Sequence, residues 1–425
     1  MKVMVVGGGG REHAIIKKLK ENREITELYA LPGNGGMAND ATCIDIGAKE
    51  IKKQVEFAVN NKIDYAVVAP DDPLVLGAVD ALNEAGIPCF GPNKAAAIIE
   101  GSKVFSKNLM KKYGIPTAEY EVFDNKDEAL KYLETAPIPT VIKADGLALG
   151  KGVIIAETRE DAKAAVISMM EDKVFGESGS NIVIEEFLTG PEVSVLSFTD
   201  GKTVVPMVSS MDHKRALDGD KGLNTGGMGT VAPNPYYTED IAKICMETIF
   251  LPTIEAMNKE NRSFKGCLYF GLMLTEKGPK VIEYNCRFGD PETQVVLPLM
   301  QSDLLAAMNA TIDGTLAETE VVFSDGAAAC VVLASGGYPE NYQKLLPISG
   351  IGADGNVEGA CVYHAGDGIK DGQLLTAGGR VLGVTATGET LAEAVSAAYA
   401  ATEQIHFEGM HKRTDIGARA LAALG

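Results

Sequence analysis

The sequence predicts a multidomain protein of mixed α/β and α+β type that begins with a doubly wound parallel sheet. Its 425 residues exceed the roughly 250–300 at which one hydrophobic core stops growing. Strand and helix patterns alternate as far as about residue 101, which is typical of a parallel sheet covered by helices. The pattern then changes twice. We therefore expect three domains, at residues 1–101, 102–324 and 325–425.

The first domain is predicted from short apolar runs separated by amphipathic segments. We expect strands at Val3–Val6, Leu28–Leu31, Asp64–Ala69 and Gly86–Phe90, and helices from about Glu12, over Glu50–Asn60 and over Leu74–Ala85. Right-handed crossovers place the carboxyl ends of parallel strands at one edge of the sheet. The loops expected there are GGGG, PGNGG (Pro32–Gly36) and PDDP (Pro70–Pro73), and loops at this edge are where such sheets bind ligands.

The opening run MKVMVVGGGGREHA at first suggests a dinucleotide-binding domain, as in NAD dehydrogenases. That fingerprint is G-x-G-x-x-G with a small third residue, followed about 20 residues later by an acid for the ribose. Read from Gly7 the third position is Glu12, and read from Gly8 it is His13. The second strand ends in Leu-Pro-Gly-Asn where the acid would stand. A dehydrogenase is therefore disfavoured, but the glycines still predict a backbone cradle for an anion at a helix N-terminus.

The remaining elements follow a different pattern. From about Ser102 we expect a helix at Lys103–Tyr113, a strand pair at Thr140–Ala144 and Gly152–Ala156, a helix at Asp161–Met170, and strands at Asn181–Glu186, from Glu192, at Leu268–Thr275 and at Lys280–Asn285. The last part should form a small α+β domain with strands at Ala328–Ala334 and Arg380–Ala386 and a helix at Leu391–Ile405.

Composition limits the partners and the compartment. The formal net charge of −19 argues against nucleic acid and against an anionic membrane surface. Small anionic substrates stay open, because screening over about 8 Å lets a few local cations outweigh distant acids. The seven cysteines are spread out and never in C-x-x-C spacing, which predicts reduced thiols, no disulfide and no zinc site. Glycine follows after only six residues, too early for a signal peptide, and we expect a cytoplasmic protein.

The densest chemical signal is VIKADGLALGKGVII, Val141–Ile155. Glycines at positions 146, 150 and 152 predict a mobile loop whose N–H groups approach an anion, with Lys143 and Lys151 near its ends. It is not a Walker A loop, which needs four residues between its glycines, Ser or Thr after the lysine, and a following helix. Here a third glycine follows the lysine and a β-branched strand comes next. The alternative is a flexible hairpin with solvated lysines.

The segment VIEYNCRFGDPETQ, Val281–Gln294, predicts a metal and phosphate site. Alternation along a strand places Glu283, Asn285 and Arg287 on one face. A carboxylate and an amide oxygen are hard ligands suited to Mg²⁺ that also touches substrate phosphates, and the arginine can bind a phosphoryl oxygen. The alternative is an edge strand with a polar solvent face. The charged turn that follows makes this alternative weaker.

A third segment, IVIEEFLTGPEVSV, places acids around a turn between two strands. A linker beside a nucleotide needs acceptors for an exocyclic amine and for ribose hydroxyls, and Glu185 or Glu186 and then Glu192 could supply them. Taken alone, acids at the surface end of a strand are the more frequent explanation.

The fourth segment is MDHKRALDGDKGLNTGGMG, Met211–Gly229. It is too polar and too rich in glycine for a core, so we predict a long functional loop, with a disordered connector as the alternative. His213 within it receives no proton-transfer role.

In this order, with GGGGREHA and PGN ahead of them, the four segments resemble the phosphoribosylamine–glycine ligases (glycinamide ribonucleotide synthetases) of the ATP-grasp superfamily. The resemblance extends from GREHA through FGPNKAAAIIEGSK to the terminal RTDIGARAL. It implies a pre-ATP-grasp domain, an ATP-grasp fold with a mobile lid at about residues 120–190, and a small C-terminal domain. It also implies that ATP phosphorylates glycine and that the amine of 5-phosphoribosylamine attacks the acyl phosphate, giving glycinamide ribonucleotide, ADP and phosphate.

The resemblance implies a role for each matching residue. For ATP these are Lys103, Lys143, the lid residues Gly146, Gly150, Lys151 and Gly152, the adenine-site residues Glu185, Glu186, Phe187 and Leu188, and Glu192 at the ribose. Glu283 and Asn285 match the ligands of Mg²⁺ or Mn²⁺. Arg287, Asp212 and Lys214 are the expected catalytic residues, and with Gly8, Gly9, Gly10, Arg11 and Asn34 they should form the phosphoribosylamine and glycine side.

The chain departs from the family pattern at four positions. Gly271 stands where other ATP-grasp enzymes usually carry a second metal-binding acid, which leaves the number of metal ions open. Met37, Asp71 and Met211 replace the usual threonine, glutamate and glutamine, changes that could alter substrate affinity.

Three other functions fit the sequence less well. A different ATP-grasp ligase or carboxylase would need another acceptor pocket, and GREHA with DHKR and NTGGMG favours the glycine ligase. A non-enzymatic nucleotide-binding module would not need Glu283, Asn285 and Arg287 together, and the NAD fingerprint fails. The expected partners are small molecules only, and a monomer is the working expectation.

Overall fold

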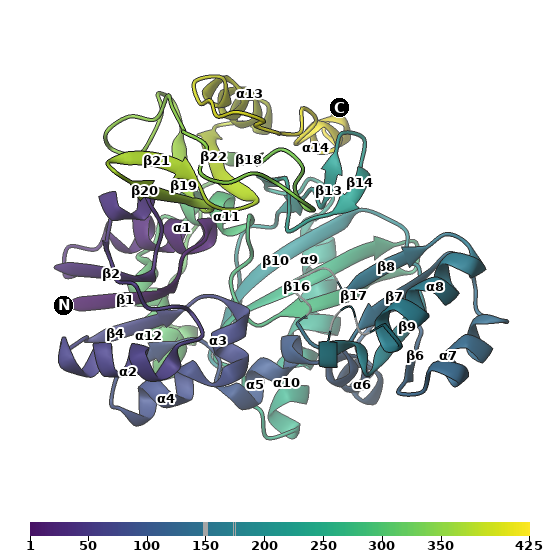
Figure 1. The fold of residues 1–425 in the computed structure, drawn as a ribbon. Coiled ribbons are helices and arrows are strands. Elements are labelled where there is room, and N and C mark those ends of the chain that lie inside the picture. The colour runs from purple at the N-terminus through teal and green to yellow at the C-terminus, as the bar shows by residue number, and fades with distance from the viewer. Residues whose placement is uncertain (148–151, 173, 175) are drawn as a thin grey trace.

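The computed structural model describes residues 1–147, 152–172, 174 and 176–425 and begins with a five-stranded parallel sheet of order β3-β2-β1-β4-β5 (Figure 1). Its strands are β1 (Lys2–Gly7), β2 (Glu27–Pro32), β3 (Thr42–Cys43), β4 (Tyr65–Val68) and β5 (Cys89–Phe90). The helices of this region are α1 (Gly10–Leu19), α2 (Ile51–Asn60), α3 (Asp71–Leu76), α4 (Ala78–Glu84) and α5 (Lys94–Gly101). The predicted doubly wound parallel sheet is confirmed.

One predicted helix of this region is two helices. The segment expected as a single helix, Leu74–Ala85, divides into α3 and α4 at Gly77, whose φ of 97° lies in the left-handed region. A glycine adopts this conformation without the steric penalty that a Cβ would bring, so it ends one helix and begins the next.

A four-stranded antiparallel sheet of order β6-β9-β7-β8 follows and stands apart on the right of Figure 1. Its elements are β6 (Tyr120–Phe123), α7 (Lys126–Leu133), β7 (Thr140–Ala144), β8 (Val153–Ala156), α8 (Arg159–Met170), the 3₁₀ turn Gly176–Gly179 and β9 (Ile182–Glu186). One face is covered by α7 and α8, whose Ala129, Leu133, Ala162 and Val166 are buried with Ile142 and Ile184.

A second antiparallel sheet, of order β11-β10-β16-β17, occupies the middle of the molecule. It consists of β10 (Glu192–Thr199), β11 (Val204–Pro206), β16 (Gly266–Thr275) and β17 (Gly278–Asn285), and it is accompanied by α6 (Lys103–Tyr113), α9 (Glu239–Cys245) and α10 (Leu251–Lys259). The Ser102 side chain accepts the Phe105 N–H at the start of α6, and Gly114 ends the helix in the left-handed conformation. These two caps fix where the lysines of α6 stand.

The third large sheet, of order β12-β15-β18-β22-β19, joins the middle of the chain to its end. Its strands are β12 (Met211–Asp212), β15 (Gly229–Ala232), β18 (Ala327–Ala334), β19 (Cys361–His364) and β22 (Arg380–Gly388). Two hairpins pair β13 (Arg215–Leu217) with β14 (Lys221–Asn224) and β20 (Asp367–Lys370) with β21 (Gln373–Thr376). Further helices are α11 (Thr293–Leu299), α12 (Leu304–Asp313), α13 (Leu391–Thr402) and α14 (Ala418–Ala423), with short 3₁₀ helices at Gly36–Asn39 and Leu316–Glu318 and a π-helix at Met246–Phe250.

The first sheet and the middle sheet share their cores. Met4 and Val6 of β1 belong to one buried apolar cluster with Val193 of β10 and Phe270 of β16. Burial of each such side chain contributes about 1.5–3 kcal/mol, so the two sheets are held together by apolar packing. Among the described helices, none combines the length and the hydropathy that crossing a membrane requires. All seven cysteines are unpaired.

A buried histidine joins the first sheet region to the last. His13 on α1 accepts the His364 backbone N–H at Nδ1, 2.8 Å away, so its Nε2 is the nitrogen that donates to Asp40, at 3.0 Å. Burial lowers the pKa of His13 to about 4, against the raising effect of its bond to Asp40. The folded protein therefore holds His13 in its neutral form.

Stability should consequently fall in mild acid. In the unfolded chain His13 gains a proton below its pKa of about 6.5, whereas in the folded protein it stays neutral down to about pH 4. A contribution of roughly 3 kcal/mol to the free energy of unfolding is therefore present above pH 6.5 and is lost as the pH falls from 6.5 to 4. We expect His13→Gln, which can keep both hydrogen bonds, to flatten the decline in free energy of unfolding between pH 6.5 and 4, measured by urea titration. Exposed His406→Gln is the control, and equal pH slopes in all three proteins would contradict this account.

Candidate active site

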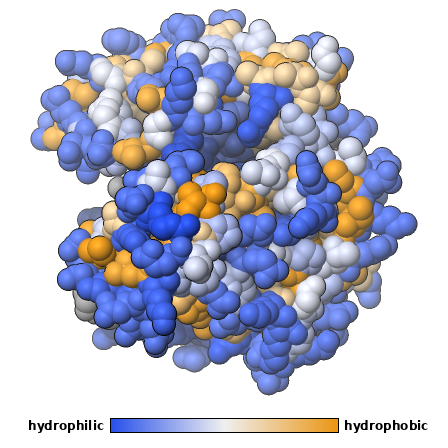
Figure 2. Space-filling model, turned by 90° about the vertical axis from the view of Figure 1, so that its right-hand side faces the viewer, coloured by the Kyte–Doolittle hydropathy of each residue, from blue (hydrophilic) through white to orange (hydrophobic). Residues whose placement is uncertain are grey.

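A cavity of ≈ 640 Å³ lies where α6, the β7–β8 hairpin, β17 and the loop before β15 converge. Figure 2 shows a hollow with mainly hydrophilic residues around it on this side of the molecule. The predicted residues that line the cavity are Lys103, Lys143, Gly152, Glu185, Glu186, Phe187, Leu188, Glu192, Asp212, Lys214, Glu283, Asn285 and Arg287. Segments far apart in the sequence therefore meet in one site, as a single ligand would require.

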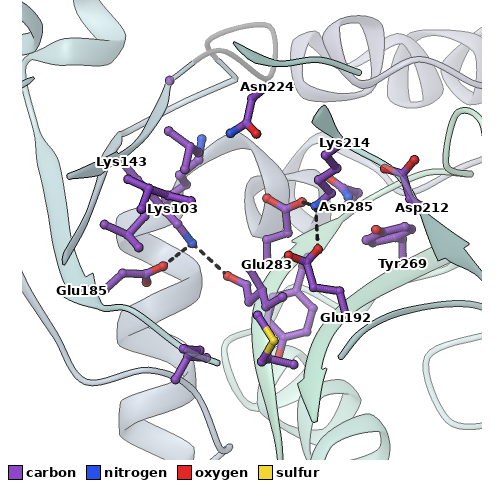
Figure 3. Close-up of a pocket in the computed structure, with 18 of the residues that line it drawn as sticks. Lys103, Lys143, Glu185, Glu192, Asp212, Lys214, Asn224, Tyr269, Glu283 and Asn285 are labelled. Atoms are coloured by element: carbon purple, nitrogen blue, oxygen red, sulfur yellow. Dashed lines mark hydrogen bonds and ion pairs between the residues drawn. The ribbon is translucent and has the colours of Figure 1, made fainter. Parts of the chain in front are cut away.

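Three lysines line the wall formed by α6 and β7. Lys103 donates to the Gly146 carbonyl at 2.6 Å, and Lys107, one turn later on α6, pairs with Glu185 at 2.5 Å. Lys143 pairs with the same carboxylate and donates to the Ile282 carbonyl at 3.2 Å. Glu185 thus bridges two buried lysines, which holds α6 against β7 and β9. Figure 3 shows Glu185 and Lys143 at this wall.

The charges of this wall reflect burial and pairing together. Burial lowers the pKa of Lys103, and it lowers that of Lys107 to about 8 although Glu185 acts in the opposite direction. Burial alone would raise the pKa of Glu185, but Lys143 and Lys107 outweigh it and lower that pKa. Glu185 was predicted to face an adenine amine, and its oxygens instead meet lysines here. Its nucleotide role stays a prediction.

The opposite wall is β17, where Glu283 and Asn285 line the cavity and are partly exposed, while Tyr284 and Cys286 are buried. Lys214 lies 3.5 Å from Glu283 and 3.7 Å from Glu192 (Figure 3). Burial would raise the pKa of Glu283, yet the surrounding lysines and Arg287 lower it to about 2. This carboxylate is therefore ionised and lies in a positively charged environment.

The residues of β17 suit a small hard cation that shares its coordination with a phosphate. Glu283 and Asn285 offer one carboxylate and one amide oxygen, and Gly271 lies opposite Glu283 in β16. A Cβ at Gly271 would come within 3.2 Å of Glu283 Cγ, so a larger residue is disfavoured there. In the described part of the chain, no three acids, histidines or cysteines form a metal-binding group. Mg²⁺ commonly takes one or two protein oxygens and completes its shell with phosphates and water, which fits this pair.

Arg287 follows β17 and lies at the inner end of the cavity. Its Nη2 pairs with Glu100 at 3.0 Å and its Nη1 donates to the Phe288 carbonyl at 3.3 Å. Its buried Nε has no hydrogen-bond partner among the described residues. The guanidinium is therefore anchored on one side and retains a donor for a ligand oxygen.

Tyr269 and the acids Asp212 and Glu292 form another part of the cavity wall. Tyr269 and Ser194 share a hydrogen bond of 2.8 Å, and Ser194 lies 3.4 Å from a Glu292 oxygen. Burial and then the nearby Glu292 charge raise the pKa of Asp212 well above its usual value. His213 contacts the Gly229 carbonyl and accepts the Gly417 N–H, so it joins two backbone segments. Burial lowers its pKa to about 4, so it is neutral at pH 7.

The predicted N-terminal residues do not line the cavity. Gly9 donates to Glu12, and Arg11 donates to Glu12 at 2.7 Å and to the Phe288 carbonyl at 3.1 Å. The Arg11 N–H also lies 3.5 Å from a carboxylate oxygen of Asp290, which does line the cavity. The anion cradle expected at the start of α1 is thus filled by carboxylates from Glu12 and Asp290. The substrate role of Gly8, Gly9, Gly10 and Arg11 stays a prediction.

Asn34 acts as a connector. Its amide nitrogen donates to the carbonyls of Gly8 at 3.1 Å and His364 at 2.8 Å, and its oxygen accepts the Met37 N–H. Both polar atoms have protein partners, so the residue ties the glycine loop to β19. Its predicted contact with substrate is untested, and Gly150 and Lys151 lie outside the described residues.

Sequence reasoning missed several cavity residues. Lys107, Glu100, Tyr269, Asp290, Glu292 and Arg419 line the site without having been singled out. Lys107 could have been found, because it stands four positions after Lys103 on a predicted helix and so shares its face. Arg419 comes from α14 near the end of the chain, and only the folded structure brings it here.

Comparison with known proteins identifies the family. Family models of phosphoribosylglycinamide synthetase match residues 1–100 (N domain), 101–293 (ATP-grasp domain) and 328–419 (C domain). Phosphoribosylamine–glycine ligases of Caldanaerobacter subterraneus and Clostridium acetobutylicum are each 48% identical over 98% of this chain, which covers 100% and 99% of theirs.

Solved structures agree with the fold. The phosphoribosylamine–glycine ligase of Thermotoga maritima is 34% identical with a TM-score of 0.84, covering 98% of this chain and 100% of its own. A biotin carboxylase domain of Hydrogenobacter thermophilus, solved with MgADP, shares the fold at 17% identity and a TM-score of 0.74, covering 97% and 91%. The predicted ATP-grasp architecture is confirmed, and the chain belongs to the phosphoribosylamine–glycine ligase family.

Proposed function

We propose that the protein joins glycine to 5-phosphoribosylamine at the expense of ATP, giving glycinamide ribonucleotide, ADP and phosphate in purine biosynthesis. The observation that carries the proposal is the oxygen pair of Glu283 and Asn285, beside Arg287 and facing lysines across one cavity. Such a site suits a nucleoside triphosphate with its metal ion. Membership of the ligase family supplies the identity of the substrates.

The reaction proceeds in two transfers. A glycine carboxylate oxygen attacks the γ-phosphorus of ATP, the bond to the bridging oxygen breaks, and ADP leaves. The nitrogen of phosphoribosylamine then attacks the acyl carbon of glycyl phosphate, phosphate departs, and the amine proton leaves with it. No side-chain nucleophile is needed, and positioning of the substrates can lower the barrier by about 7–11 kcal/mol.

The cations of the site have distinct tasks. Lys103 and Lys143 bind the phosphates of ATP, and the free donor of Arg287 stabilises the transferring phosphoryl group. Glu283 and Asn285 would hold Mg²⁺ or Mn²⁺, which when bound neutralises charge on the phosphates. Closure of the β7–β8 hairpin, with its lid loop, over the nucleotide would keep water from the acyl phosphate.

The far side of the cavity receives the other substrates. Asp212 and Lys214 line the same cavity as Glu283 and offer a carboxyl group and an ammonium group to the amine and carboxylate of glycine. The N-terminal glycine loop and Asn34 shape the phosphoribosylamine side, next to Asp290.

The activity is tested by ADP release from purified protein with Mg·ATP, glycine and phosphoribosylamine made fresh from ribose 5-phosphate and ammonia. We expect ADP release to require both glycine and the amine. A parallel reaction with bicarbonate in place of glycine tests the carboxylase chemistry of the structural neighbours. ADP release without dependence on glycine would contradict the proposal.

Glu283→Gln should reduce turnover by about 100-fold or more while the fold stays intact, because it removes a metal charge from a strand face that is not part of the core. Steady-state ADP release and the thermal unfolding temperature check this. Glu276→Gln, at the exposed turn after β16, is the matched control. Turnover equal to that of the control would mean that β17 is only structural.

A further inference from the structure

Glu100 lies at the end of α5, directly behind β17. It is only 9% exposed, although its side chain borders the cavity. Within the segment IIEGSK, Lys103 has a task in the proposed reaction, whereas Glu100 has none so far. Burial of an acid is costly unless its oxygens accept hydrogen bonds from several donors.

Three donors converge on this one carboxylate. The Cys286 N–H donates to Glu100 Oε2 at 2.7 Å, and Arg287 Nη2 pairs with Oε1 at 3.0 Å. The Asn285 amide nitrogen reaches Oε1 at 2.9 Å when the amide is turned so that its nitrogen faces Glu100. Three consecutive residues at the end of β17 are therefore fixed by a single side chain.

The contact with Asn285 decides which way its amide points. With the nitrogen toward Glu100, the amide nitrogen also lies 3.3 Å from the Tyr284 carbonyl, so both of these contacts pair a donor with an acceptor. The reverse orientation sets the amide oxygen against a carboxylate oxygen, which is repulsive. The favoured orientation leaves the Asn285 oxygen for the cavity, and oxygen is the atom that a hard cation binds.

The charge state of Glu100 follows from its partners. Burial and the nearby Asp71 charge raise its pKa, and the Arg287 charge and the hydrogen bonds with Cys286 offset that rise only in part. The three contacts described above are all with donors, and the Glu100 oxygens accept them without needing a proton of their own. Arg287 in turn has its pKa raised, chiefly because Glu100 and Asp71 outweigh its burial.

We propose that Glu100 is a positioning residue that turns the Asn285 oxygen toward the metal ion and fixes the Arg287 guanidinium at the transferring phosphoryl group. This inference rests on the proposed function, because it concerns the same nucleotide site. One carboxylate would then couple the metal ligand to the phosphoryl-binding arginine. Groups that orient metal ligands typically contribute about 10- to 100-fold to metal affinity.

A direct test measures Mn²⁺ binding to the full-length protein in the presence of ADP, by electron paramagnetic resonance and without turnover. Glu100→Gln keeps the size of the side chain, but it replaces one acceptor oxygen with an NH₂ group. That group cannot accept a hydrogen bond, so at least one of the three donors loses its partner. We expect its Mn²⁺ dissociation constant to rise about 10- to 100-fold, with a fall in kcat for ADP release that persists at saturating metal.

Asp200→Asn is the matched control, since Asp200 is also a buried carboxylate, 5% exposed, that accepts the backbone N–H groups of Lys202 and Thr203. It does not line the cavity, so we expect it to affect stability and to leave Mn²⁺ affinity within twofold. Glu100→Asp retains the charge, provides a second measurement if Glu100→Gln does not fold, and should also weaken Mn²⁺ binding.

The outcomes separate the two proposals. Failure of the unmodified protein to bind Mn·ADP would count against the proposed function itself. Normal Mn²⁺ binding by the unmodified protein together with unchanged affinity in a folded Glu100 variant would overturn only the positioning role. A loss of affinity equal to that of Asp200→Asn would likewise show that Glu100 serves stability alone.

Discussion

The site depends on the attraction between the Glu283 carboxylate and the cations that surround it. Lys214, Lys143, Lys103 and Arg287 each lower its pKa, and each comes from a different segment of the chain. An isolated buried carboxylate would be neutral or would destabilise the fold, so the acid and its cations must assemble together. In a chain with a net charge of −19, these four cations gather at one point, where the proposed polyphosphate ligand would need them.

The N-terminal parallel sheet and the sheet that contains β19 and β22 both support that arrangement. His13 and Asn34 join the first sheet to β19 through His364, which keeps the glycine loop in place. Arg380 of β22 donates to the carbonyls of Gly226 and Asp290, so the C-terminal sheet also holds the loop beside the cavity. The distant ends of the chain thus fix the positions of residues that the middle of the chain supplies.

The sequence predicted those features that depend on local pattern. Alternation along β17 identified Glu283 and Asn285 as neighbours on one face, and the amphipathic pattern of α6 placed Lys103 at its start. The pairing of Glu185 with two lysines was not predictable, because it depends on how α6 packs against another sheet. The same holds for Arg11, whose Nε donates to Glu12 and whose Nη1 donates to a backbone carbonyl that only the fold brings near.

The central claim is that Glu283 and Asn285 hold the metal ion of the nucleotide. The most direct measurement is a crystal structure with Mn²⁺ and ADP, in which anomalous scattering locates the metal. The account predicts a single dominant peak about 2.1–2.3 Å from a Glu283 oxygen and from the Asn285 amide oxygen. A peak bound by other residues, or bound nucleotide with no metal at β17, would contradict it.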